Sequence, residues 1–501
     1  MRAPQWSEIG IELTADDAVD DPYAVAVEVD FRHDDGTRIV RPAFWDGGTT
    51  WRVRFASTAG SGAWRWSARA DRALDGVDGA TGSVDAAAAT GAPALLRMAP
   101  GGRVVERHDG TPWLMVADTP WALPWRATRD ECRAYAAIRQ RQGFNAALLM
   151  SFQPDLIRPR ARRRGEDDCW DEAFDDLGGR RLFQLRPEYF RELDALADIL
   201  HAHGIVPVWQ PAFHGYGFRG GPVAGREVPA EDYARYCRYL VARYGARPAI
   251  WLVGADGTGR DATVAAGGAM VEACDAYRQP TGIHYAPHAS DHEHHDAPWL
   301  DFHWCQTGHN GEHHPERVAA MWLDRPVRAI ANGEPTYENI GCPGRAAGWW
   351  QGHEAWSSLF AGGTMGVVYG AGSLWQWRPT RGEAQAGWAG ADGCDWRDAL
   401  DFPGAAHVGR IGRILDGLSL AGAAPDHRAT YGRSGLIDPG RLFLCYLEAG
   451  GTVDIIDERA PRPWRAIDLG TGDEIARGTR AAAHGRIALP DGRPTLVICA
   501  R

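Results

Sequence analysis

The feature that most constrains this chain is an alternation of buried apolar runs and helical segments between residues 92 and 422. Such runs are typical of β-strands that are buried on both faces. The first seven runs occupy residues 113–119, 145–152, 205–210, 249–254, 282–285, 300–306 and 327–331. The eighth consists of 366–369 together with 373–377. Eight strand–helix units over this length predict a (β/α)8 barrel rather than an open doubly wound sheet. The absence of a GxGxxG motif after an early strand also argues against a dinucleotide-binding fold.

Both flanks of this region lack the helical pattern. Residues 1–91 contain short alternating runs separated by Gly- and Asp-rich turns, and residues 423–501 again contain only short strands. Both patterns are typical of small β-sandwiches. We therefore predict a multidomain α/β protein, with an N-terminal β-sandwich over residues 1–91, a (β/α)8 barrel over 92–422 and a C-terminal β-sandwich over 423–501. The sandwiches are expected to be structural or oligomerisation modules.

Composition excludes several classes of function. The chain has 54 basic and 65 acidic residues and a net charge of −11, which argues against a nucleic-acid-binding face. Every basic residue is Arg, so lysine chemistry such as Schiff-base catalysis or a P-loop is excluded. Nine scattered Cys without a CxxC pair, and an N-terminus without an apolar signal core, predict a cytoplasmic protein with reduced thiols. The uncharged stretch 355–377 contains a Gly-Gly break and predicts a helix followed by a buried strand, not a membrane span.

Two carboxylates stand at predicted strand ends, where barrel enzymes carry their active sites. Asp256 follows a run of five apolar residues, and Glu334 precedes Pro335 at the end of the seventh strand. The fourth and seventh strands lie on opposite sides of a small barrel, so the two carboxylates can face each other across a bound sugar. Glycoside hydrolysis needs such a pair. Either residue alone could equally be a helix cap or an Arg partner, but both together favour catalysis, and we predict Asp256 and Glu334 as catalytic.

Aromatic and polar residues gather at the same strand ends. Sixteen of the 22 Trp lie between Trp113 and Trp396, and indole faces suit the apolar faces of sugars, although each Trp taken alone is better explained as core. We predict that the substrate contacts Asp118, Trp121, Gln153, Trp209, His214, His284, His303, Gln306, His309, Tyr337, Glu338, Trp375 and Trp377.

Histidine is concentrated in one segment, since nine of the 18 His lie between His284 and His314. Imidazole is a common metal ligand, which raises a metal site as an alternative. No HExxH motif occurs and no Lys could bridge two metals, so we predict no metal and no organic cofactor. His292, His294, His295, His313 and His314 are expected in surface loops. A further polar segment, the Arg-rich run 158–164 with the acidic stretch 166–176, is predicted to form a solvated, self-complementary loop over the cleft.

The order of motifs along the chain resembles the apiosidase-like glycoside hydrolase family over all three predicted domains. The motifs are FWDGG at 44–48, DTPW at 118–121, GFN at 143–145, IWLVGAD at 250–256, QTGH at 306–309, GEPTYE at 333–338 and WQW at 375–377. The resemblance implies a barrel glycosidase whose strand-four Asp is the acid/base and whose strand-seven Glu is the nucleophile, here Asp256 and Glu334. Departures from the family pattern occur at Ala117, Ala255, His303, Thr307 and Asn332, so the sugar need not be apiose.

These observations predict an exo-acting, retaining glycosidase that releases a terminal sugar from an oligosaccharide or small glycoside. A pentose or furanose such as apiose is one candidate sugar. The expected partner is a carbohydrate, and we expect binding to neither nucleic acid nor a membrane. The sequence leaves open whether the protein forms a homo-oligomer. Two alternatives remain at this point: a non-catalytic carbohydrate-binding protein that kept the cleft, and a metal-dependent hydrolase built on the histidines.

Overall fold

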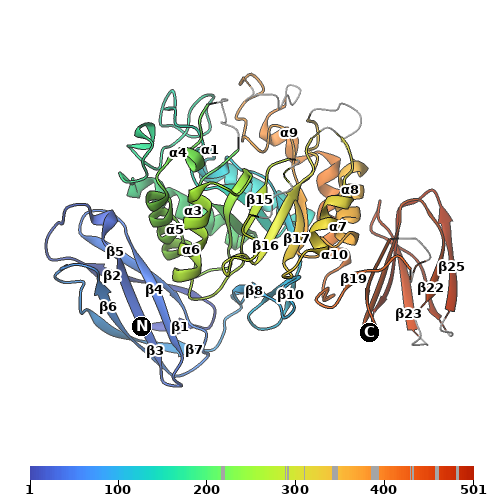
Figure 1. Ribbon diagram of the computed structural model, residues 1–501, viewed down its shortest axis with the longest axis horizontal. Helices are drawn as coiled ribbons and strands as arrows, with labels where there is room; N and C mark the ends of the chain where they lie inside the picture. Colours follow the sequence, from blue (N-terminus) through green and yellow to red (C-terminus); the bar gives the residue numbers. More distant parts are fainter. Residues whose placement is uncertain are drawn as a thin grey trace.

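The computed structural model describes residues 1–215, 221–287, 289, 293–309, 311–340, 348–384, 394–428, 430, 434–456, 462–480 and 484–500. Figure 1 shows three parts in chain order: a blue β domain at the N-terminus, a central barrel of strands and helices, and a red β domain at the C-terminus. The predicted fold class is therefore confirmed.

Eight parallel strands form the barrel: β11 (Met115–Asp118), β12 (Ala146–Met150), β13 (Val206–Gln210), β14 (Ile250–Gly257), β15 (Thr281–Tyr285), β16 (Phe302–Gln306), β17 (Ala329–Glu334) and β18 (Gly366–Tyr369). They pair in the order β17-β16-β15-β14-β13-β12-β11-β18. Met365, just before β18, donates its N–H to the Ile330 carbonyl of β17 at 3.2 Å, which helps to close the ring. Alternate side chains fill the barrel interior or pack against the helices, so both faces of each strand are buried and the strands are apolar runs in the sequence.

Helices surround the strands: α2 (Arg129–Gln142), α3 (Pro187–Ala202), α5 (Ala230–Tyr244), α6 (Ala262–Cys274), α7 (Pro315–Leu323), α8 (Trp349–Phe360) and α10 (Pro403–Ile414). Three short helices, α1 (Leu123–Arg126), α4 (Ala224–Glu227) and α9 (Trp396–Leu400), lie in connections that follow the C-terminal ends of strands. The predicted helix and strand within 355–377 are the end of α8 and β18. Among the described helices, none has both the length and the apolar character needed to span a bilayer.

The N-terminal sheet packs on the barrel helices. Its strands are β1 (Arg2–Pro4), β2 (Glu8–Thr14), β3 (Val27–His33), β4 (Arg38–Trp45), β5 (Thr50–Ala56), β6 (Ala63–Ala70) and β7 (Thr81–Ala87). β4 pairs with β3 through its first part and with β5 through its last two residues, so the sheet folds around one apolar core. The fully buried Arg41 donates to the Val241 carbonyl of α5 at 2.8 Å, which holds this domain to the barrel. A small sheet of β8 (Leu96–Met98), β9 (Val105–Arg107) and β10 (Pro112–Trp113) follows.

The C-terminal domain is a small antiparallel sandwich. One sheet contains β19 (Ala424–Pro425), β20 (Ser434–Asp438), β21 (Leu442–Leu447), β26 (Thr495–Ala500), β23 (Arg462–Asp468) and β24 (Glu474–Arg480), and the other contains β22 (Gly450–Ile456) and β25 (His484–Asp491). The domain contacts the barrel through Tyr446, whose hydroxyl lies 2.7 Å from His353 Nδ1 of α8, and through Arg410 of α10, which donates to the Gly470 carbonyl at 2.8 Å.

Candidate functional site

Both predicted catalytic carboxylates lie at β-bulges at the C-terminal ends of their strands. The pairing of β14 with β15 shifts between Ala255 and Gly257, which leaves Asp256 as the extra residue with a left-handed φ of 56°. The pairing of β17 with β16 shifts just before Glu334, so that Gly333 is the extra residue there. Bulges redirect side chains and are common beside active sites. The barrel is therefore irregular at the two strand ends that carry these carboxylates.

Asp256 fits closely against the connection that follows β13. A Cβ placed on Gly215 would lie 2.0 Å from Asp256 Oδ2, so a residue without a side chain is needed there. The N–H of His214 donates to the Ala255 carbonyl at 3.2 Å and holds this connection against the bulge. Asp256 as a whole is 7% exposed and therefore buried.

Glu334 is held by groups from three strand ends. His309 Nε2 lies 3.1 Å from Oε1, and His284 Nε2 lies 3.5 Å from Oε2. His309 Nδ1 accepts the backbone N–H of Tyr337 at 3.1 Å. Because one nitrogen of a neutral imidazole accepts while the other carries the proton, Nε2 is the donor to Glu334. The backbone thus fixes the tautomer that binds the carboxylate.

These neighbours keep Glu334 ionised. Burial by itself would raise the pKa of the Glu334 carboxyl, but the His309 hydrogen bond, the charges that His284 and His309 can carry, and a hydrogen bond with Tyr337 lower it below the ordinary value of 4.5. Burial in turn lowers the pKa of His284, opposed by the charge of Glu334. A carboxyl with a lowered pKa is suited to act as a nucleophile and poorly suited to donate a proton.

Tyr337 links Glu334 to an indole. Trp121 Nε1 donates to the Tyr337 hydroxyl at 2.8 Å, and since an indole can only donate, the tyrosine proton remains available for Glu334. The Trp121 ring also lies parallel to His284, with ring centroids 6.2 Å apart. Trp375 is partly buried and packs against Tyr337. The structure therefore groups Trp121, His284, His309, Tyr337 and Trp375 around Glu334.

Gly370, which follows β18, provides the space that the Tyr337 ring occupies. A Cβ on Gly370 would lie 2.1 Å from two ring carbons of Tyr337. We expect Gly370→Ala to displace that ring from Glu334 and to lower kcat/KM on the order of 10²-fold, as misplaced catalytic groups do. Steady-state kinetics measures this loss. Gly10→Ala on β2, where an added Cβ meets nothing within 4 Å, is the matched control and should leave activity unchanged.

Buried amide groups with atoms that lack a partner among the described residues lie at three strand ends. Both polar atoms of Gln153, after β12, and Oε1 of Gln210 and Gln306, at the ends of β13 and β16, have no hydrogen-bond partner among the described residues. A buried amide without a partner is costly in a folded protein, so a polar ligand or water is expected to pair with these groups. Gln210 was not among the predicted site residues, although it alternates with the inward-facing Val206 and Val208 on β13.

The structure corrects the predictions for two tryptophans. Trp209 faces outward from β13 and stacks on Tyr244 of α5, with ring centroids 4.5 Å apart. Trp377 stacks on Trp396 of α9 at 4.5 Å and meets Tyr135 of α2 edge-on. Both indoles pack the layer between strands and helices, where a large aromatic side chain buries its apolar surface.

Two predicted histidine ligands also lie outside the cleft. His214 is fully buried, with Nε2 3.1 Å from the Thr263 hydroxyl of α6, and burial lowers its pKa to about 3. His303 alternates with the inward-facing Phe302 and Trp304, and its ring meets Tyr285 and His295 in the outer layer. His214 therefore packs behind the Asp256 bulge, and His303 packs outside the barrel.

Two predicted acidic ligands are occupied within the protein. Glu338 accepts from the N–H of Gly348 and Gly404 at 2.7 and 2.9 Å, and from the Tyr369 hydroxyl at 2.7 Å. Asp118 pairs with Arg139 at 2.6 Å and accepts the N–H of Thr119 at 2.8 Å, with no exposed surface. Both carboxylates join elements of the barrel, and the geometry does not support either as a direct sugar ligand.

The remaining polar segments have simple interpretations. In the described part of the chain, no cluster of three or more His, Cys, Asp or Glu could hold a metal ion. His292 lies outside the described residues, whereas His314 pairs with Glu312 at 3.1 Å. Arg162 pairs with Glu172 and Asp175, both at 2.8 Å, so the Arg-rich loop is neutralised by its own acidic stretch as predicted.

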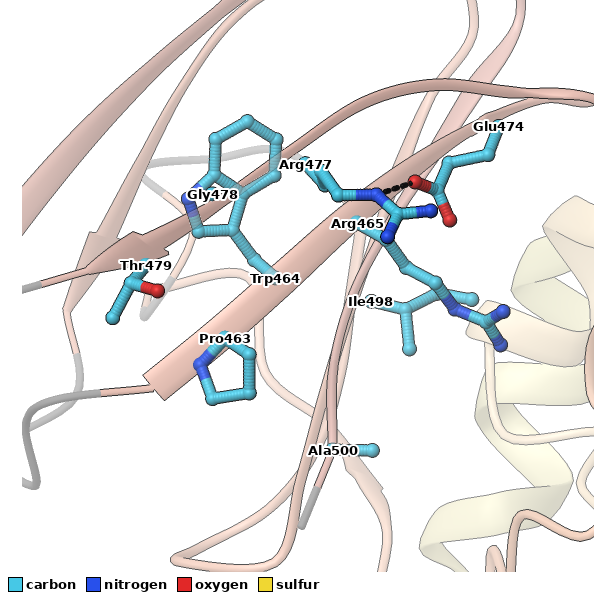
Figure 2. Close-up of a pocket in the computed structure, with 9 residues that line it drawn as sticks. All are labelled: Pro463, Trp464, Arg465, Glu474, Arg477, Gly478, Thr479, Ile498 and Ala500. Atoms are coloured by element: carbon cyan, nitrogen blue, oxygen red, sulfur yellow. Dashed lines mark hydrogen bonds and ion pairs between the residues drawn. The ribbon is translucent and has the colours of Figure 1, made fainter.

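A separate hollow of about 530 Å³ lies on the C-terminal domain, between β23, β24 and β26 (Figure 2). It is lined by Pro463, Trp464, Arg465, Glu474, Arg477, Gly478, Thr479, Ile498 and Ala500. Among the described residues that line it, Glu474 is the one carboxylate, and it is paired with Arg477. Glycoside hydrolysis needs two carboxyl groups, so this hollow cannot supply the predicted chemistry.

Comparison with known proteins identifies the barrel as a catalytic domain. The family model described as "Apiosidase-like, catalytic domain" matches residues 99–421, and a domain of unknown function, DUF5060, matches residues 2–71. No curated protein matches. A candidate glycoside hydrolase from Bacteroides vulgatus superposes with a TM-score of 0.73 at 16% identity, covering 100% of this chain and 99% of that one. A glycoside hydrolase family 5 protein from the same organism gives 0.68 at 19% identity, covering 81% and 93%. At these identities the structures establish the fold alone.

Proposed function

The chain belongs to the apiosidase-like family of glycoside hydrolases, and from that premise we propose an exo-acting, retaining glycosidase that releases a terminal sugar from an oligosaccharide or small glycoside. In the first step Glu334 attacks the anomeric carbon while Asp256 protonates the departing oxygen, which leaves a glycosyl ester on Glu334. In the second step Asp256 takes a proton from water, and the water oxygen displaces Glu334 from the anomeric carbon.

The environment of Glu334 is the observation that carries this proposal. A carboxylate that His309 and Tyr337 keep ionised is suited to the role of nucleophile. The acid/base role is then left to Asp256. Asp256 stands on a different strand end, as the extra residue of a β-bulge. A pair of carboxyl groups with distinct roles is what a retaining mechanism requires.

The connections after β11, β12 and β18 favour a short substrate. Arg126 and Glu383 form a fully buried ion pair, and Glu383 Oε1 also accepts the N–H of Asp168 at 2.8 Å. Thr380 donates its hydroxyl to Asp167 at 2.7 Å. Joined connections beside the barrel mouth limit how far a polymer could run through it. This favours release of a single terminal sugar, and a pentose or furanose such as apiose remains a candidate.

The test is a release assay on a panel of aryl glycosides that includes pentofuranosides and pentopyranosides. Release of one sugar identifies the substrate, and NMR of the first product anomer distinguishes retention from inversion. Sugar binding without release would support the non-catalytic alternative. Loss of release in a chelator, with recovery on adding a divalent metal, would support the metal-dependent one.

The pH profile tests the assignment of Glu334. Its pKa is lowered in the folded protein, so kcat/KM should persist below pH 4.5 and fall only as the pH drops through that lowered value. Tyr337→Phe removes one of the groups that lower the pKa, and the acidic limb should move to higher pH. Tyr244→Phe, which removes a buried hydroxyl that has no hydrogen-bond partner among the described residues, is the control and should not move it.

A further inference from the structure

Helix α8 carries a buried carboxylate that the proposed mechanism does not use. Glu354 has no exposed surface. Its Oε1 accepts the hydroxyl of Thr307 at 2.7 Å, and its Oε2 accepts the backbone N–H of Thr336 at 3.1 Å. A buried carboxylate is costly unless each oxygen has donors, and here the donors come from the ends of two different strands, β16 and β17.

The two turns that Glu354 joins carry the partners of Glu334. Thr307 precedes His309 by two residues, and Thr336 directly precedes Tyr337. The turns are also tied to each other, because the Thr336 hydroxyl donates to the Gly308 carbonyl at 3.3 Å and the Thr307 N–H donates to the Glu334 carbonyl at 3.2 Å. Any shift of Glu354 would therefore be passed to His309 and Tyr337, two of the groups that hold the Glu334 carboxylate.

Helix α8 is itself fixed from outside the barrel. His353 is next to Glu354, and its Nδ1 lies 2.7 Å from the hydroxyl of Tyr446 on β21. Trp356 of the same helix stacks on the Tyr446 ring, with centroids 6.4 Å apart. The C-terminal sheet thus supports the side of α8 opposite to the active site, which holds Glu354 at a defined distance from the two turns.

We propose that Glu354 is a positioning residue, which holds His309 and Tyr337 in the geometry that orients and ionises Glu334. This inference rests on the proposed role of Glu334 as the nucleophile. Glu354 does not itself touch substrate, so the loss of Glu354 should lower kcat with little change in KM.

The test is Glu354→Gln in the full chain. Glutamine keeps the volume and one acceptor, but its NH2 group must face either Thr336 N–H or the Thr307 hydroxyl, so that one donor loses its acceptor. We expect kcat to fall about 10- to 100-fold, as for misplaced catalytic groups. The acidic limb of kcat/KM should also move to higher pH, because His309 and Tyr337 would lower the Glu334 pKa less. Thr307→Ser, which keeps the hydroxyl, should retain activity, whereas Thr307→Val should behave like Glu354→Gln.

Asp275→Asn is the matched control for burial. Asp275 is also buried and accepts from Trp251 Nε1 at 2.9 Å and from Gln279 N–H at 3.1 Å, near the opposite, N-terminal end of the barrel. It should lower stability without changing the pH profile. If Glu354→Gln altered only stability, as Asp275→Asn does, the proposal would be overturned.

A second readout separates this inference from the proposed function. Nitrogen-15 NMR of labelled histidine reports whether His309 carries its proton on Nε2, with or without turnover. The wild type should show that tautomer, and Glu354→Gln should lose it. An unchanged His309 signal in the variant would overturn the positioning role. If the wild type cleaves no glycoside but the His309 signal still changes in Glu354→Gln, the result would refute the proposed function alone.

Discussion

Glu334→Gln is expected to abolish glycoside cleavage while leaving the fold intact. An amide cannot form the glycosyl ester, and loss of a covalent nucleophile lowers kcat on the order of 10⁴-fold or more. Glutamine fills the same space and can still accept the N–H of His309, so the local geometry should survive. Rates of sugar release, compared with the wild type at equal circular dichroism, measure the effect.

The neighbouring Glu338→Gln is the matched control for this substitution. Glu338 is also buried, but its oxygens bind Gly348, Gly404 and Tyr369 rather than facing the site. Its replacement should cost about 1–3 kcal/mol of stability through one unpaired donor and leave turnover measurable. A slow 2-fluoro glycoside should also label Glu334 covalently, as peptide mass spectrometry would show. Label on another residue, or full turnover by Glu334→Gln, would disprove the nucleophile assignment.

Strand positions could be predicted because both faces of each barrel strand are buried. The run at 205–210 corresponds to β13, Val206–Gln210, and the run at 249–254 to the first part of β14, Ile250–Gly257. The last residues of β14 were missed because a bulge has no periodic pattern. That bulge sets the direction of Asp256, so the sequence placed the residue at the correct strand end without indicating how it is oriented.

Which face a strand residue occupies was the main source of error. Position at the end of β13 led to the prediction of Trp209 as a substrate contact and not of Gln210, but only one of two adjacent residues can face the cleft. On β13 the inward positions are Val206, Val208 and, by the same alternation, Gln210, which leaves Trp209 against α5. Applying the two-residue period before selecting ligands would have excluded Trp209 and included Gln210.

The other errors depend on partners far away in the sequence. Glu338 is the last residue of a motif rich in site residues, yet its oxygens are bound by Gly404 and Tyr369. Glu354 lies on a helix outside the motifs, and only the fold brings it to Thr307 and Thr336. Local patterns cannot predict such pairings, because they are decided by tertiary packing.

Asp256→Asn should impair cleavage to an extent set by the leaving group. General acid–base catalysis accelerates reactions about 10²- to 10⁴-fold. We expect Asp256→Asn to lose this acceleration on glycosides with basic leaving oxygens. Aryl glycosides of acidic phenols depart without a proton, so their first step should be nearly preserved and the glycosyl ester should accumulate. A burst of phenol followed by slow turnover would be the kinetic sign of that accumulation.

Azide provides the complementary test of the same residue. It needs no deprotonation, and it can occupy the space where water would meet Asp256, so it should restore turnover of Asp256→Asn and yield a glycosyl azide with the anomeric configuration of the substrate. Azide should not accelerate Glu334→Gln in this way, because no glycosyl ester forms there. Asp261→Asn, at the residue just before α6, is the control for replacing a carboxylate by an amide in this part of the chain. Equal losses for good and poor leaving groups would exclude Asp256 as the acid, and the proton donor would then have to be sought on another strand end.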